Sequence, residues 1–172
     1  MRFILLLLVF LAGPALAEQI NLLPPGSQVE LRAYGLGLIP LDGKFTRFHG
    51  WMRYDPANPD ACQVVLEIEA ASLVMSEEAI RDEIIGPEFM DVSRFPDLTF
   101  HGNCQGDAVA GSLLLHGQTL PFSLDLTRSA LTITATGHLR RADWGITARP
   151  FTAGPTIRIR VEIPNPGNGP HT

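Results

Sequence analysis

Five histidines are the residues of this chain best suited to metal binding or proton transfer. They are His49, His101, His116, His138 and His171, and none lies in an HExxH or similar ligand spacing. Four of them fall on predicted strand faces opposite the apolar residues, where a metal site would need partners from neighbouring strands. We interpret these four as solvated surface side chains and expect no metal site.

Carboxylates and serines also fail to form a catalytic pattern. Asp91 and Asp97 are near enough in sequence to suggest an acid–base pair. Asp91, however, lies three residues before Arg94, which indicates a local ion pair that stabilises a turn. No serine stands in a nucleophile elbow, and no glycine-rich loop leads into a helix. We therefore predict that the protein is not an enzyme and uses no cofactor.

The first 17 residues have the layout of a secretory signal. The basic Arg2 precedes the apolar run Phe3–Leu11, and the small-residue end Ala15-Leu16-Ala17 favours cleavage before Glu18. This run is too short for a membrane span, which needs about 20 apolar residues. We expect a periplasmic or secreted protein without stable membrane insertion.

Composition argues against nucleic-acid binding. The 172 residues carry 13 basic and 18 acidic side chains, a net charge of −5, and the charges are scattered. Residues 18–163 are long enough for one ordinary domain with a substantial core. The Pro/Gly-rich residues 164–172 are expected to form a flexible tail.

A period-two alternation of apolar and polar residues runs through the domain and predicts β-strands. The eight expected strands are Val29–Tyr34, Phe45–Tyr54, Gln63–Ala70, Leu98–His101, Val109–Leu115, Leu120–Thr127, Leu131–Thr136 and Ile157–Ile163. Their second face carries charged and threonine side chains, which indicates a soluble barrel and not an outer-membrane one. The predicted fold is therefore all-β, an eight-stranded antiparallel barrel.

Two interruptions of this alternation predict departures from regular strands. The parity of the second strand slips between Phe45 and Phe48, which together with Gly50 predicts a bulge or a sharp bend. Glu77–Ile85 is the single helix candidate, and Ser76 is placed to cap its N-terminus. This helical excursion connects the third strand to the fourth.

The expected strand pairing brings the two cysteines together. If the third and fourth strands pair antiparallel with Leu66 opposite Phe100, then Cys62 falls opposite Cys104 on the same face. An exported compartment permits a disulfide there, which would stabilise the fold by about 4 kcal/mol in the chain-entropy model. Two free thiols are the alternative, and mass measurement with and without reductant distinguishes them.

Six stretches, taken together and in order, resemble the YceI-like family over nearly the whole domain. They are Gly43–Gly50, Arg81-Asp82, Glu88–Val92, Phe95–Phe100, Gly111–Pro121 and Arg141–Ile146. The sequence departs from the family pattern at Gly35, where the family often has a histidine, so any head-group contact by that histidine is missing. It also departs at Met90 and Trp144, where phenylalanine is more usual, and the cysteine pair is not general in the family.

The resemblance implies a lipocalin-like barrel whose apolar tunnel holds a polyisoprenoid lipid or an isoprenoid-tailed quinone. The expected function is lipid binding or carriage, with a hydrophobic isoprenoid ligand as partner, no nucleic acid, and a homodimer left open. The helix and the residues after it would cover one side or end of the tunnel. The residues expected to line the tunnel are Leu31, Phe45, Phe48, Met52, Leu66, Ile68, Phe89, Met90, Phe100, Leu113, Leu115, Phe122, Leu124, Ile133, Trp144, Ile159 and Val161.

Two other interpretations stay open from the sequence. An enzyme acting on a small hydrophobic or lipid substrate would place ionisable groups inside the tunnel, whereas the alternation places nearly all of them outside. A filled barrel would act only as an interaction module and would lack an elongated cavity, since eight-stranded barrels occur both filled and hollow.

Overall fold

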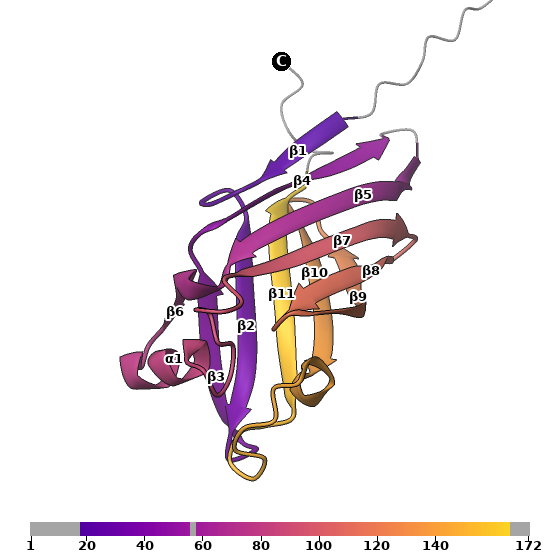
Figure 1. The fold of residues 1–172 in the computed structure, drawn as a ribbon. Coiled ribbons are helices and arrows are strands. Elements are labelled where there is room, and N and C mark those ends of the chain that lie inside the picture. Colours follow the sequence, from indigo (N-terminus) through magenta and orange to yellow (C-terminus); the bar gives the residue numbers. More distant parts are fainter. Residues whose placement is uncertain (1–17, 56–57, 166–172) are drawn as a thin grey trace, which may run out of the picture.

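The structure is a computed structural model that describes residues 18–55 and 58–165. The predicted signal, the centre of the predicted turn after Asp55, and most of the predicted tail lie outside the described residues. Eleven strands are described (Figure 1), and their bounds are β1 Glu18–Leu22, β2 Gln28–Gly35, β3 Ile39–Phe45, β4 Phe48–Asp55, β5 Asn58–Glu69, β6 Leu73–Met75, β7 Asp97–Gln105, β8 Ala108–Leu115, β9 Gln118–Arg128, β10 Thr132–Arg140 and β11 Thr156–Pro164.

All eleven strands belong to one antiparallel sheet that curls over on itself. The strand order is β1-β4-β5-β7-β8-β9-β10-β11-β2-β3-β6. In Figure 1, β4, β5, β7 and β8 run across the front, while β2, β3, β10 and β11 stand upright behind them. The apolar core lies between these two groups of strands, which together form a half-barrel. The all-β antiparallel barrel class is confirmed, but the predicted number of eight strands is wrong.

The strands that the alternation missed are short or poor in β-forming residues. β1 has five residues and β6 has three. β3 contains Pro40, Asp42 and Gly43, which are depleted in strands. Its pairing with β2 nevertheless places Phe45 opposite Val29, and both side chains are at most 2% exposed. Burial against the core therefore overrides the local preference of the β3 residues.

Of the two predicted departures, the sharp bend is confirmed and the bulge is not, because the parity slip marks a bend at Thr46 between the end of one strand and the start of the next. β3 ends at Phe45 and β4 begins at Phe48. The β4–β5 ladder is regular through Gly50 and shifts only at Tyr54/Asp55. A Cβ at position 50 would lie 2.2 Å from the Val65 carbonyl oxygen, so glycine is needed there for close strand approach.

The link between β3 and β4 forms a seam that joins the two halves of the sheet. The Thr46 amide donates to the Ser72 carbonyl at 3.2 Å, and the Ser72 hydroxyl donates to the Arg47 carbonyl at 3.2 Å. The Arg47 guanidinium pairs with Glu69 at the end of β5. A short 3-10 helix, Ala70–Ser72, completes this seam and leads into β6.

The predicted helical excursion is confirmed as α1, Glu78–Ile85, between β6 and β7. The predicted capping role of Ser76 is wrong: Glu77 is the N-cap and makes no side-chain cap hydrogen bond. Arg81 fixes the helix by donating to the Leu73 and Ala71 carbonyls at 3.1 and 3.0 Å. No helix among the described residues is long and apolar enough to cross a membrane.

The segment after α1, residues 86–96, folds back as a cover along the side of the barrel. The Met90 amide donates to the Ile84 carbonyl at 2.9 Å, and the Phe95 amide donates to the Asp91 carbonyl at 2.9 Å. Asp91 is buried and accepts hydrogen bonds from Ser93 at 2.9 Å and Arg94 at 3.5 Å. The predicted local pair of Asp91 and Arg94 is therefore confirmed.

The predicted register of β5 and β7 is also confirmed. Leu66 lies opposite Phe100, and Cys62 and Cys104 form a disulfide with their Cα atoms 4.8 Å apart. The bond joins β5 and β7 close to β1, since Cys62 pairs with Tyr54 of β4 and Tyr54 pairs with Glu18 of β1.

Candidate functional site

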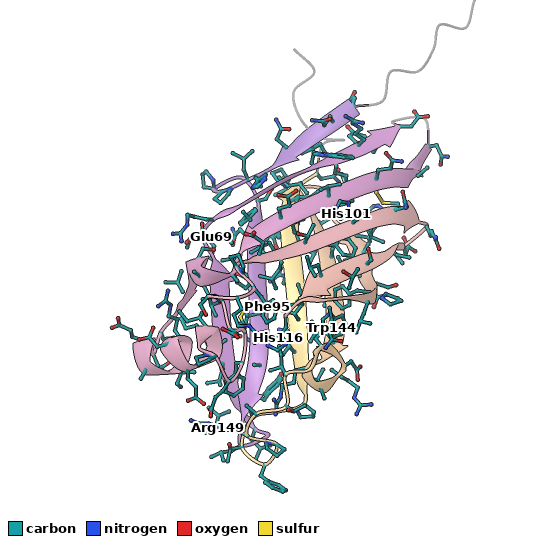
Figure 2. All side chains as sticks on the ribbon, in the orientation of Figure 1. Glu69, Phe95, His101, His116, Trp144 and Arg149 are labelled. Carbon is teal, nitrogen blue, oxygen red and sulfur yellow. A yellow bond between two sulfur atoms is a disulfide. The ribbon has the colours of Figure 1, made fainter. Side chains whose placement is uncertain are left out.

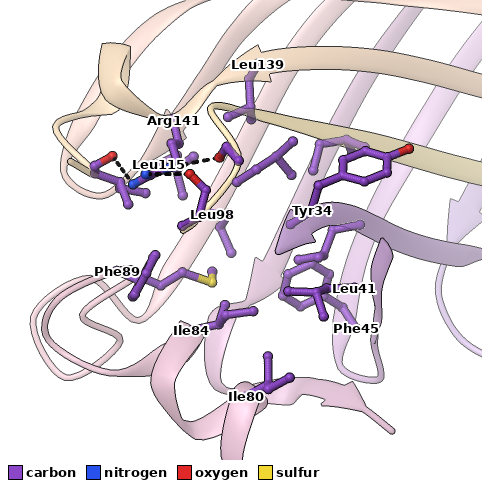
Figure 3. Close-up of a pocket in the computed structure, with 18 of the residues that line it drawn as sticks. Tyr34, Leu41, Phe45, Ile80, Ile84, Phe89, Leu98, Leu115, Leu139 and Arg141 are labelled. Atoms are coloured by element: carbon purple, nitrogen blue, oxygen red, sulfur yellow. Dashed lines mark hydrogen bonds between the residues drawn. The ribbon is translucent and has the colours of Figure 1, made fainter. Parts of the chain in front are cut away.

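The curled sheet encloses two apolar cavities of similar size. The first, of about 350 Å³, lies beside α1 and is here called the helix-side cavity; Figure 3 shows its wall. The second, of about 360 Å³, has Cys62 and Cys104 in its wall and is called the disulfide-side cavity. Each volume lies near the lower limit for ligand-binding pockets.

The two cavities share part of their walls. Leu66, Phe100, Leu124 and Val161 line both of them. These four side chains come from β5, β7, β9 and β11, so both halves of the sheet contribute to the partition. The partition is thus the wall that the two cavities share, and its Phe100 ring lies edge-on to the ring of Phe122 at a centroid distance of 6.2 Å.

Most of the predicted tunnel residues lie in these cavity walls. Those in the wall of the helix-side cavity are Leu31, Phe45, Leu66, Ile68, Phe89, Met90, Phe100, Leu113, Leu115, Phe122, Leu124, Ile159 and Val161. The disulfide-side cavity adds Met52 and Ile133. Contact of any of these residues with a ligand stays a prediction.

Phe48 and Trp144 do not line either cavity. Phe48 starts β4 opposite Ile68 and is buried in the packed core beside the seam. The Trp144 indole lies edge-on to Phe122 and donates to the Leu113 carbonyl at 3.4 Å, so it supports the wall from behind. Neither residue is in the wall of these two cavities, and a contact of either with a ligand stays a prediction. Strand parity identifies an inward side chain but not whether space remains in front of it.

Small residues of the strands contribute unequally to the free space in the barrel. Ala33 lines the helix-side cavity and Ala135 lines the disulfide-side cavity. At Gly137, by contrast, a Cβ would lie 2.5 Å from the Phe122 ring, and at Gly111 it would lie 1.9 Å from the His101 carbonyl oxygen. These glycines permit close packing and leave no cavity in front of them.

Polar side chains gather at the two ends of the cavity pair. The polar and charged residues in the wall of the helix-side cavity are Tyr34, Glu83, Arg141, Arg149 and Thr152. At the other end they are Glu18, Tyr54, Arg128 and Asn165. Because the shared partition is wholly apolar, the arrangement suits an elongated apolar molecule with polar surroundings at its ends.

Arg141 is the functional candidate that sequence reasoning missed. It lies in the 3-10 helix Arg141–Trp144 and is only 5% exposed. The hydrogen bonds that it makes to described residues all go to backbone carbonyls, those of Gly154, Ile146, Ala153 and Arg149, at 2.9 to 3.5 Å. Burial lowers the pKa of its guanidinium. Figure 3 shows Arg141 beside the cavity wall, where it holds the following loop in place.

The loop that Arg141 holds is also connected to the cover. Arg149 forms an ion pair with Glu83 of α1 at 2.9 Å. The Arg141 guanidinium lies 5.8 Å from the ring centre of Phe89, which is itself part of the cavity wall. In the sequence, Arg141 stands out only as part of the stretch Arg141–Ile146. Its partners are backbone carbonyls, and these leave no pattern of side chains that would identify it.

The buried ionisable groups do not converge on a reaction centre. Asp91 is buried but is absent from both cavity walls and is held by Ser93 and Arg94. Arg141 reaches the helix-side wall with its hydrogen bonds directed to the loop carbonyls. The ionisable side chains that pair in the cavity walls are Glu83 with Arg149 at one end and Glu18 with Tyr54 at the other. The cavities themselves count against a completely filled barrel.

The four histidines that the structure describes lie on the outside of the barrel or in a turn. His49, His101 and His138 are exposed on outer strand faces, as predicted. His116 differs, since it lies in the β8–β9 turn with Nδ1 3.0 Å from the Trp144 carbonyl and its ring 4.7 Å from that of Phe95 (Figure 2). Within residues 18–55 and 58–165, no three His, Cys, Asp or Glu side chains are grouped to hold a metal. His171 lies outside the described residues.

At the disulfide-side end, Tyr54 and Glu18 form a hydrogen bond across β4 and β1. Burial and this bond raise the pKa of Tyr54 to about 12. The phenol therefore stays a neutral donor throughout the ordinary pH range.

Known proteins with similar sequences cover most of this chain. The family model for the YceI-like domain matches residues 21–164. A UPF0312 protein of Yersinia enterocolitica is 32% identical over 161 residues, covering 89% of this chain and 79% of the relative. UPF0312 proteins of Yersinia pestis match to the same extent.

Solved structures share the fold at lower sequence identity. Burkholderia cenocepacia BcnA superposes with a TM-score of 0.62 at 20% identity, covering 79% of this chain and 94% of that one. A polyisoprenoid binding domain from Saccharophagus degradans, implicated in plant cell wall breakdown, gives a TM-score of 0.60 at 14% identity, with 83% and 95% covered. The YCEI protein of Campylobacter jejuni gives 0.55 at 16% identity, with 72% and 82% covered.

Proposed function

The chain belongs to the YceI-like family, and on that premise we propose that it is an exported protein that binds and carries one polyisoprenoid or isoprenoid-quinone chain. The observation that carries this proposal is the pair of apolar cavities that share one apolar partition. The Saccharophagus degradans domain of the same fold, which binds polyisoprenoid, supports it.

The cavity pair suits a flexible linear ligand better than a compact one. A long prenyl chain is thin, so a shift of the side chains at the partition would let it pass from one cavity into the other. The favourable free energy of binding would come from burial of apolar surface, at about 25 cal/mol per Å² before the cost of ordering the chain. Selection for chain length would follow from the combined depth of the two cavities.

Binding, and not catalysis, is the function that the described residues support. The ionisable side chains in the cavity walls lie at the two ends, and the partition between them is apolar. A polar end group could be solvated at either end, while the walls offer a prenyl chain no reactive partner. Export is supported by the Cys62–Cys104 bond, which fits an oxidising compartment.

Native mass spectrometry of the gently purified protein tests the proposal. We expect a one-to-one complex whose ligand, after extraction, is identified as an isoprenoid. Ligand-free protein should then take up an isoprenoid quinone in a one-to-one ratio. A homogeneous ligand-free protein that also fails to take up any member of a quinone series would overturn the proposal.

A further inference from the structure

One end of the molecule presents apolar side chains to solvent. Large apolar residues that are exposed among the described ones number eight, and five of them lie on the β2–β3 hairpin or on the adjoining loop before β11. The most exposed four, here called the apolar tip, are Leu36 at 65%, Leu38 at 85%, Ile39 at 54% and Phe151 at 96%. Exposed clusters of this kind commonly mark interaction surfaces.

The backbone of the apolar tip is firmly built. The Leu36 amide donates to the Thr152 carbonyl at 2.7 Å, and the Gly154 amide donates to the Tyr34 carbonyl at 2.7 Å. These bonds tie the β2–β3 hairpin to the loop before β11, and both lie at the end of the molecule opposite β1 (Figure 1). Arg141 fixes the same loop through its carbonyls. The side chains are thus held in solvent by an ordered scaffold.

The apolar tip is continuous with the helix-side cavity. Leu36 and Ile39 are exposed and also line that cavity. Ala153 and Gly154, in the loop before β11, line the same cavity. An apolar surface therefore runs from the outermost side chains of the tip into the cavity wall. This continuity identifies the tip as the rim of the cavity mouth.

The charge pattern at the tip selects the kind of partner. Residues 33–41 and 150–157 contain no charged side chain. The charges around them balance: Arg32 pairs with Asp42, which also interacts with Arg158, and Arg149 pairs with Glu83 and lies 3.8 Å from Glu88. A surface that is apolar at its centre and nearly neutral at its rim suits the interface of a lipid bilayer, without a requirement for anionic lipid.

We propose that the apolar tip docks on the surface of a lipid bilayer and sets the mouth of the helix-side cavity against it. This inference rests on the proposed function, because the ligand would then pass between bilayer and cavity without crossing water. Docking is shallow and reversible, since only a few apolar side chains enter the interface.

Vesicle flotation with phosphatidylcholine and phosphatidylethanolamine tests this inference. Burying one large apolar side chain is worth about 1.5 to 3 kcal/mol, which corresponds to at least about tenfold in partition. We expect Phe151→Ser to lower vesicle binding about tenfold and Leu38→Ser with Phe151→Ser to lower it about a hundredfold. Leu131→Ser is the matched control, because Leu131 is 78% exposed at the opposite end, just before β10.

Two further measurements keep the test decisive. Phe151→Trp should show a blue-shifted emission with vesicles and quenching by brominated lipid, whereas Leu131→Trp should show neither. Raising salt from about 0.1 M to about 1 M, which shortens the screening length from about 10 to about 3 Å, should leave binding nearly unchanged. Binding that disappears with salt would contradict insertion of the apolar tip.

The outcomes separate this inference from the proposed function. Wild-type protein that carries an isoprenoid yet ignores vesicles would overturn the docking inference alone. Protein that takes up no isoprenoid but binds vesicles through Phe151 would overturn the proposed function alone. A wild-type dimer that Phe151→Ser converts to a monomer, seen by sedimentation without vesicles, would assign the tip to self-association and also overturn docking.

Discussion

At the disulfide-side end of the barrel, β5 and β7 are joined by a covalent bond, whereas hydrogen bonds and the Arg149–Glu83 ion pair hold the loops at the helix-side end. The first end is rimmed by polar side chains, including Glu18 and Tyr54. The second presents the apolar tip and a cover built from a helix and irregular chain. The contrast indicates a cross-linked end with a polar rim and a mouth with an apolar rim, and four predictions test it.

Loss of the disulfide should have the largest effect on stability. Cys62→Ala with Cys104→Ala removes a cross-link between residues 42 apart, worth about 4 kcal/mol of unfolding free energy in the chain-entropy model. Urea unfolding measures the loss, with reduced wild-type protein as the matched comparison. Vesicle binding should be kept by the folded variant. Unchanged stability would show that the bond does not constrain this end.

Loss of Arg141 should have the next largest effect and should act on the mouth. Arg141→Met leaves several loop carbonyls without their donor, and we expect the unfolding free energy to fall by about 3 kcal/mol. Arg141→Lys should recover only part, because an ammonium lacks the guanidinium fork. Arg140→Met, at the exposed neighbouring position, is the control. Equal stability of the Met variants would contradict the role of Arg141.

The disulfide and Arg141 show which kinds of feature the sequence predicts and which it does not. The Cys62–Cys104 bond followed from apolar matching of two strands, because strand register is a periodic property. Arg141 could not be found in that way, since its partners are carbonyls whose positions depend on the completed loop. β3 was missed because Pro40 and Gly43 disfavour a strand, and only its neighbours in the sheet overrule them.

The cavities themselves mark the limit of the sequence prediction. Alternation placed Phe48 and Ile133 equally inside the barrel, yet the structure packs one into the core and sets the other in a cavity wall. Free space depends on how side chains from distant strands fill the interior, and no local pattern records this.

Filling one cavity at a time should separate the roles of the two ends. Ala135→Phe fills the disulfide-side cavity, so we expect loss of binding for long prenyl chains while short ones still bind. Ala33→Phe fills the helix-side cavity, beside the mouth, and should weaken binding of every chain. The free energy of unfolding of each variant should stay unchanged or rise by up to about 1 kcal/mol, because the added ring enters existing space.

Native mass spectrometry with a series of quinones of different chain length measures which chains each variant binds. Identical length profiles for the two variants would refute separate roles.

Changes of pH should have the smallest effects on the free energy of unfolding. One contribution should disappear as the pH falls, and the other, at the disulfide-side end, as the pH rises. At the seam near α1, the hydrogen bond from Arg47 lowers the pKa of Glu69. A carboxyl with a lowered pKa stabilises the fold above its ordinary pKa of about 4, and that contribution disappears as pH falls through the folded value. Tyr54 has a raised pKa of about 12, so its contribution is complete below about pH 10 and disappears as pH rises toward 12.

Thermal unfolding across pH, with two matched variants, measures these contributions. Glu69→Gln should reduce the loss of stability on acidification, and Tyr54→Phe should reduce the loss above about pH 10. Neither variant should alter the pH response assigned to the other. A variant whose stability changes with pH in the same way as that of the wild type would show that the substituted residue does not contribute to this pH dependence.

The central claim is that one prenyl chain occupies both cavities through the partition of Leu66, Phe100, Leu124 and Val161. A crystal structure of the protein loaded with a long-chain isoprenoid quinone tests it most directly. We predict one continuous chain with atoms in both cavities and those four side chains moved aside around it. A ligand bound on the outer surface, or a chain confined to one cavity with the partition closed, would contradict the claim.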